Sequence, residues 1–243
     1  MGNIVKTYIL LGILTGLFIG IGNLLGGAQG AITGLVIAAI MNFISYYFSD
    51  KIVLSMYRAQ YVNESEAPEL YSIVKELTQK AQIPLPKIYI IPLEAPNAFA
   101  TGRNPAHSAV AVTQGLLRIL DTRELRGVLA HEISHIKNRD ILVGTIAATL
   151  AGAIMFIVRM FFWFGAGSRD ERRNGNPVIG LLFLIFAPLA ATLIQLAISR
   201  SREYLADYSG GKLSGDPLAL ANALRKLETW AKQIPIPANP GTS

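Results

Sequence analysis

The sequence predicts a mainly α membrane protein that carries a small α+β domain, with four transmembrane helices arranged in two hairpins. Two observations on composition support this class: 51% of the 243 residues are hydrophobic and only 16% are charged. Globular domains carry about 25% charged residues on average, and the mean hydropathy of this chain is +0.40. The third observation is the pattern, because long uncharged stretches alternate with polar ones.

This alternation divides the chain into four segments. We expect a transmembrane hairpin over residues 1–50, the first part of a polar domain over 51–140, a second transmembrane hairpin over 141–199, and the second part of the polar domain over 200–243.

The distribution of the basic residues argues against a nucleic-acid partner. A formal net charge of +6 and a pI near 9.6 are compatible with nucleic-acid binding. However, the basic residues are scattered, and no basic run is interleaved with aromatic residues. We therefore expect no nucleic-acid partner. The chain has no cysteine, which excludes disulfides and thiolate metal sites.

The N-terminal segment is long enough for two spanning helices. No residue between Lys6 and Asp50 is charged, and one span needs about 20 apolar residues. Glycines and amides over Gly22–Gly30 interrupt the run, which predicts helices over 7–22 and 30–48. A cleaved signal peptide is disfavoured, because a second apolar run follows directly and no small-residue cleavage site is evident.

Residues 51–140 combine helical and strand patterns. Apolar residues at a spacing of three and four predict a surface helix near residues 66–82, with Leu70, Ile73, Val74 and Leu77 on its buried face. Short β-rich runs separated by turn residues predict strands over 87–91, 97–102 and 108–115.

A longer helix follows these strands. Asp121 or Thr122 can cap it, and Glu124 stands near the capping-box position. The helix therefore begins about ten residues before His131, so that His131 and His135 lie well inside it. A second helix is predicted after Asp216, which can act as its N-cap.

The sequence HEISH within this helix has the spacing of a zinc site. His131 and His135 are four residues apart and project from one helix face. Two imidazoles in that arrangement can both reach one Zn²⁺ at about 2.0–2.1 Å. Glu132 is rotated about 100° from His131, so it can act on a metal-activated water without binding the metal.

A catalytic zinc needs a third protein ligand. His107 is the only other histidine, and its position in a turn-like segment indicates an exposed loop residue. Glu203 is the better candidate, because it lies on a predicted helix directly after the second hairpin. Asp207, one turn further on, can accept the free ring N–H of a ligand histidine. Tyr204 could donate a hydrogen bond to an oxyanion formed at the metal, but its place directly beside Glu203 is expected to point it away.

Topology supports the pairing of these distant residues. A hairpin returns the chain to its starting side, so residues 51–140 and 200–243 share one side with the N-terminus. Eleven Lys and Arg fall in the first of these segments and six in the second, against Arg169, Arg172 and Arg173 in the loop of the second hairpin. The positive-inside rule then predicts a multi-pass protein of the cell membrane whose polar domain faces the cytoplasm.

With HEISH and the later REYLAD between membrane hairpins, the chain resembles the HtpX family of membrane-bound zinc metalloproteases along essentially its whole length. This resemblance implies a zincin-like catalytic domain of the gluzincin type, with one zinc ion bound by His131, His135 and Glu203. It also implies that Glu132 is the general base and that Asp207 orients an imidazole, that of His131.

The resemblance extends to substrates. It implies an endopeptidase for misfolded or damaged membrane proteins, active in stress response and quality control at the lipid bilayer. A substrate cleft would be lined by the NAFAT segment, where an extended peptide can add as a strand. That segment comprises Asn97, Ala98, Phe99, Ala100 and Thr101.

One departure from the family leaves alternatives open. Members of the family usually continue into a His-Pro segment and a downstream Arg near the active site, and this sequence contains neither. A catalytically silent zinc-binding scaffold is therefore one alternative. A transporter or channel with a transition-metal site is another, disfavoured because such sites lie near the bilayer midplane and these histidines lie in a polar segment.

Overall fold

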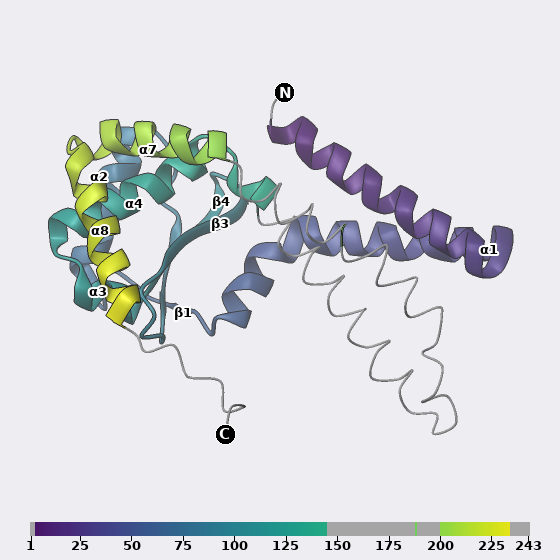
Figure 1. Cartoon of the computed structure of the whole chain (residues 1–243), viewed down its shortest axis with the longest axis horizontal. Helices are drawn as coiled ribbons and strands as arrows, with labels where there is room; N and C mark the ends of the chain where they lie inside the picture. Colours follow the sequence, from purple (N-terminus) through teal and green to yellow (C-terminus); the bar gives the residue numbers. More distant parts are fainter. Residues whose placement is uncertain (1–2, 145–187, 189–199, 234–243) are drawn as a thin grey trace, which may run out of the picture. The chain divides into compact units, whose positions relative to one another are not determined.

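The computed structural model describes residues 3–144, 188 and 200–233 and divides the chain into two compact units (Figure 1). The first unit comprises Met1–Val53 and Arg139–Arg200, and the second comprises Leu54–Asn138 and Ser201–Ser243.

The first unit contains all but the last turn of α1, Asn3–Met56, which is two helices joined at a break. The backbone leaves helical geometry at Gly26 and Gly27, and Gly27 has a positive φ of 56° that glycine adopts without strain. A Cβ on Gly22 would stand 2.1 Å from the carbonyl oxygen of Gly30. The two arms therefore touch backbone to backbone next to the turn, as small residues permit.

The second arm of α1 meets the length requirement for a membrane span. Gly26–Phe48 has 23 residues and a mean hydropathy of 1.7, and at 1.5 Å per residue it covers the roughly 30 Å hydrocarbon core. Within the described residues it is the one helix that is long and apolar enough. The predicted hairpin over 141–199 lies almost wholly outside the described residues, so a total of four spans stays a prediction.

The second unit contains a four-stranded sheet with the order β1-β2-β4-β3. Its strands are β1 (Gln60–Tyr61), β2 (Lys87–Ile91), β3 (Ala98–Asn104) and β4 (His107–Thr113). β2 and β4 are parallel, while β1 pairs with β2 and β3 pairs with β4 in antiparallel fashion. β3 is thus an edge strand (Figure 1).

The sequence predicted three of these strands, with errors of one or two residues at the ends of two of them: the expected strand 97–102 is observed as Ala98–Asn104. The expected strand 108–115 ends at Thr113, where α3 (Gln114–Ile119) begins. The Thr113 hydroxyl accepts a bond from the N–H of Leu116 and so acts as an N-cap. β1 was not predicted, since two residues carry no detectable periodicity.

Four further helices complete the second unit. They are α2 (Pro68–Ala81), α4 (Thr122–Lys137), α7 (Arg200–Ser214) and α8 (Pro217–Gln233). The predicted apolar face of α2 is buried. α4 starts with a complete capping box, in which Asp121 and Glu124 each accept a backbone N–H of the other.

α4 is the central helix of this unit and packs against α2, α8 and β3. Its contact with α8 is close, because a Cβ on Gly127 would stand 2.5 Å from the backbone nitrogen of Leu220. Beside this crossing, Lys226 of α8 lies 2.5 Å from the carboxylate of Glu124. The helix that carries HEISH is therefore held at both its capped end and its middle.

Candidate active site

The two motif histidines lie on one face of α4, as their spacing requires. Their Nε2 atoms are 3.1 Å apart, and the rings meet edge to face. Both side chains are largely buried, with 16% of His131 and 15% of His135 exposed. Two imidazole nitrogens thus converge at one point on the surface of the helix.

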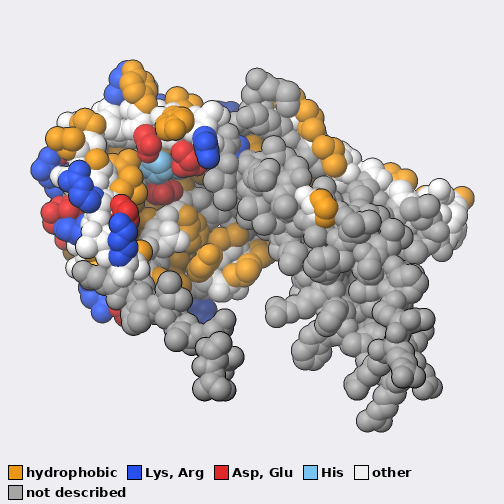
Figure 2. Space-filling model, in the orientation of Figure 1, with side chains coloured by type: hydrophobic (Ala, Val, Ile, Leu, Met, Phe, Trp, Pro, Cys, Tyr) orange, Lys and Arg blue, Asp and Glu red, His pale blue; other side chains and the backbone are white. Residues whose placement is uncertain are grey.

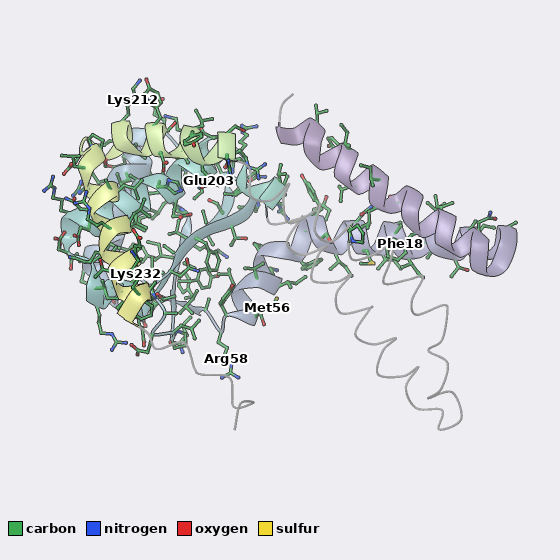
Figure 3. The ribbon with its side chains drawn as sticks, viewed as in Figure 1. Phe18, Met56, Arg58, Glu203, Lys212 and Lys232 are labelled. Carbon is green, nitrogen blue, oxygen red and sulfur yellow. The ribbon has the colours of Figure 1, made fainter. Side chains whose placement is uncertain are left out.

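α7 brings a carboxylate to the same point. Glu203 Oε2 lies 3.5 Å from Nε2 of His131 and 3.5 Å from Nε2 of His135, and the side chain lies where α7 crosses beside α4 (Figure 3). Figure 2 shows a histidine at this surface with acidic side chains around it. The three residues form a group that could hold a metal ion.

The separations of these donor atoms fit a tetrahedral zinc ion. Ligands about 2.0–2.1 Å from zinc at tetrahedral angles stand about 3.3–3.4 Å from one another. The observed separations of 3.1, 3.5 and 3.5 Å lie within a few tenths of an ångström of that figure. Small rotations of the side chains can make up such a difference. Two neutral nitrogens and one carboxylate oxygen are also a donor set that zinc accepts.

A glycine permits this approach of the two helices. A Cβ on Gly210 would stand 3.0 Å from both Cα and N of His131 and 3.2 Å from the carbonyl carbon of Ala130. All three are backbone atoms, which cannot move without displacing α4. Gly210 follows Glu203 by seven residues, two helical turns, so it lies on the same face of α7.

Asp207 lies on that face as well and meets the other ring nitrogen of His131. Its Oδ1 is 2.9 Å from Nδ1, within hydrogen-bond distance. A proton held on Nδ1 leaves Nε2 with a free lone pair on the side of Glu203 and His135. Burial, followed by the neighbouring His135, lowers the pKa of His131 below its usual value, although Asp207 and Glu203 oppose this shift. The neutral, metal-binding form is therefore favoured.

Glu132 occupies a different position from the three donors. Its Oε2 accepts a hydrogen bond of 2.9 Å from the backbone N–H of Ala100 in β3. The carboxylate therefore lies between the motif helix and the edge strand. A polypeptide along β3 would pass next to this carboxylate.

The register of β3 determines which of its backbone groups face away from β4. The carbonyl of Asn97 accepts a bond of 2.9 Å from the N–H of Thr113, so Asn97 is directed toward β4. Successive residues alternate in an antiparallel pair. The N–H and C=O groups of Ala98 and Ala100 are therefore directed toward the free edge, and the bond from Ala100 to Glu132 agrees with this.

The side chains of the predicted cleft segment differ in exposure. Asn97 is exposed, and Ala98, Phe99 and Ala100 are half-buried. Thr101 is only 1% exposed, so its side chain belongs to the core, and the same alternation directs its backbone groups toward β4.

The other residues weighed from the sequence lie away from this centre or point outward. His107 is exposed at the turn between β3 and β4, where its Nδ1 is 3.0 Å from Asn104 Oδ1. Tyr204 is 72% exposed, despite its place beside Glu203. Sequence reasoning missed the backbone amide of Ala100 and the role of Gly210. For Gly210 a signal existed, because a glycine inside a helical pattern often marks a close contact.

Comparison with known proteins gives consistent matches. The family model described as Peptidase family M48 matches residues 64–237. A "Protease HtpX homolog" of Desulforapulum autotrophicum is 56% identical over 247 residues, covering 100% of this chain and 80% of that protein. One of Pyrococcus furiosus is 58% identical over 243 residues, covering 98% of this chain and 84% of that protein.

A solved structure shares the fold. The crystal structure of Ste24p of S. mikatae matches with a TM-score of 0.54 at 22% sequence identity. The match covers 94% of this chain but 59% of that one, so this chain spans about three fifths of the length of Ste24p.

We expect Gly210→Ala to weaken zinc binding by about tenfold or more. The new Cβ would push α7 away from His131 and so move Glu203 and Asp207 together, and disturbing such supporting contacts typically costs 10–100-fold in metal affinity. The measurement is the zinc dissociation constant of the purified protein by competition with a chelator.

Gly211→Ala is the matched control, because its Cβ would come no closer than 3.2 Å to Pro217 and would not meet α4. Equal zinc affinities in the two variants would contradict the role given to Gly210.

Proposed function

The chain belongs to peptidase family M48 and, within it, to the HtpX proteases, and from this premise we propose that it is an integral membrane zinc endopeptidase. One observation carries the proposal: Nε2 of His131, Nε2 of His135 and Oε2 of Glu203 stand at the mutual distances of three tetrahedral ligands. These residues would hold one zinc ion per chain.

The chain's own residues supply the proton transfers. A bound zinc would supply Lewis acidity, which acidifies water and polarises the scissile carbonyl. The Glu132 carboxylate accepts the proton of the attacking water and then delivers it to the leaving amine nitrogen. A proton held on Nδ1 of His131 by Asp207 would leave Nε2 of His131 free to bind the metal.

The free edge of β3 is proposed to bind the substrate. An extended polypeptide can pair with the outward backbone groups of Ala98 and Ala100, with Asn97 and Phe99 beside it and Thr101 next along the strand. A segment whose backbone groups are already paired within a folded protein cannot add to this edge, whereas an unfolded segment can. We therefore assign unfolded or damaged membrane proteins as substrates, in quality control. Equal cleavage of one membrane protein in its folded and unfolded forms would refute this class.

The membrane topology of the proposal has two hairpins, 1–50 and 141–199, that anchor one catalytic domain formed by 51–140 and 200–243. Its support is the apolar span Gly26–Phe48 together with the distribution of basic residues. The catalytic domain faces the cytoplasm at the surface of the cell membrane, where it lies next to the lipid bilayer.

Glu132→Gln is expected to abolish proteolysis while retaining zinc. The amide keeps the size of the side chain but cannot accept the water proton, and loss of a general base typically costs 10²–10⁴-fold. The measurement is cleavage of an unfolded polypeptide by the full chain in detergent, alongside the zinc content of the same sample.

Glu228→Gln, an exposed carboxylate in an ion pair on α8, is the matched control and should keep full activity. Proteolysis at the wild-type level by Glu132→Gln would overturn the assignment of the base.

The topology can be tested by labelling single cysteines, since the chain has none of its own. We expect Ser168→Cys to react with a membrane-impermeant maleimide in intact cells. Ser72→Cys, on the exposed side of α2, should react only after the membrane is permeabilised. Labelling of Ser72→Cys in intact cells would place the catalytic domain outside and contradict the proposal.

A further inference from the structure

The edge strand is bonded to the residue next to the metal ligands. The N–H of Ala100 donates to Oε2 of Glu132 at 2.9 Å, across 32 positions of sequence. The donor is a backbone group, fixed by the pairing of β3 with β4, whereas the acceptor is a side chain with rotatable bonds. The strand therefore determines where this carboxylate oxygen lies.

This hydrogen bond does not replace any hydrogen bond between β3 and β4. Ala100 stands opposite Val110 in the ladder, and the alternation that starts from the Asn97 carbonyl directs its N–H to the free edge. In an isolated edge strand that N–H would face solvent. Here the N–H of Ala100 donates to Glu132 of α4, and the ladder bonds of Phe99 and Thr101 on either side are unaffected.

We propose that the Ala100 amide is a positioning group for the base, which holds one oxygen of Glu132 so that the other faces the metal ligands. This rests on the proposed function of Glu132. Hydrogen bonds to a charged group are among the stronger ones in proteins. Because the donor is preorganised, the carboxylate does not need to be oriented anew in each catalytic cycle.

The same bond ties the register of a bound polypeptide to the base. The N–H and C=O of one strand residue face the same side, so Ala98 offers a substrate both groups. Ala100 offers only its carbonyl, because its N–H is engaged by Glu132. A substrate strand therefore loses one ladder bond at Ala100, next to the carboxylate. The substrate peptide bond opposite the engaged N–H of Ala100 is the one presented to Glu132.

Proline substitutions separate the two roles along this one edge. Ala100→Pro removes the donor to Glu132, and proline is tolerated on edge strands where the N–H faces away from the ladder. We expect kcat to fall roughly 10- to 100-fold, the range for losing a hydrogen bond to a charged group. KM and zinc content should remain near wild type, since the carbonyl of Ala100 and all three ligands are retained.

Ala98→Pro is the matched variant. It removes an outward N–H two residues away that is offered to the substrate and not to the base. We expect KM to rise roughly 2- to 10-fold, while kcat is retained. A merely structural effect of proline in β3 would instead change both variants alike, and would also lower their melting temperatures.

If Ala100→Pro does not fold, L-lactic acid incorporated at position 100 replaces the N–H by an ester oxygen and leaves the backbone angles free. A wild-type kcat in either folded form would overturn the inference. An active Glu132→Gln would instead overturn the base assignment itself. Inactive Glu132→Gln together with normal Ala100 variants would leave the proposed function standing and reject only the positioning role.

Discussion

The backbone contact between Gly210 and His131 is the constraint on which the site depends. Glu203 and Asp207 share one face of α7 with Gly210, so a single close approach brings both carboxylates to the imidazoles of α4. Neither helix contains a complete site. Because side chains reach only a few ångströms, a gap opened by one methyl group would separate the carboxylate of Glu203 from His135 as well.

Burial and charge are divided unequally across this contact. The histidines are largely buried on α4, whereas Glu203 and Asp207 on α7 are nearly half exposed. Burial lowers the pKa of His131 and so favours the neutral imidazole, the form that can bind a metal. Glu132 belongs to neither set, because its partner is the backbone of Ala100 in the edge strand. The proposed metal site, the proposed base and the proposed substrate strand thus lie on two helices and one strand that meet in the second unit.

The sequence predicted the parts of the site that depend on local geometry. A cap at Asp121 fixes where α4 begins, and helical spacing then places His131 and His135 on one face. The choice of Glu203 needed a topological argument as well, in which a predicted hairpin of two spans returns the chain to the same side. The contacts of Gly210 and of the Ala100 amide could not be predicted. Periodicity shows which face of an element is buried, but not which backbone atoms of another element it meets. β1 and α3 were missed because they are too short for any period to register.

The zinc content of the detergent-purified protein, wild type beside Glu203→Ala, tests whether α7 supplies the third metal ligand. We expect one tightly bound zinc per chain in the wild type and its loss, or a sharp fall in affinity, in the variant. Glu203 is half exposed on α7, so its truncation should leave the fold intact. Full zinc occupancy in both proteins would show that α7 does not supply the third ligand and would contradict the assembly of the site from α4 and α7.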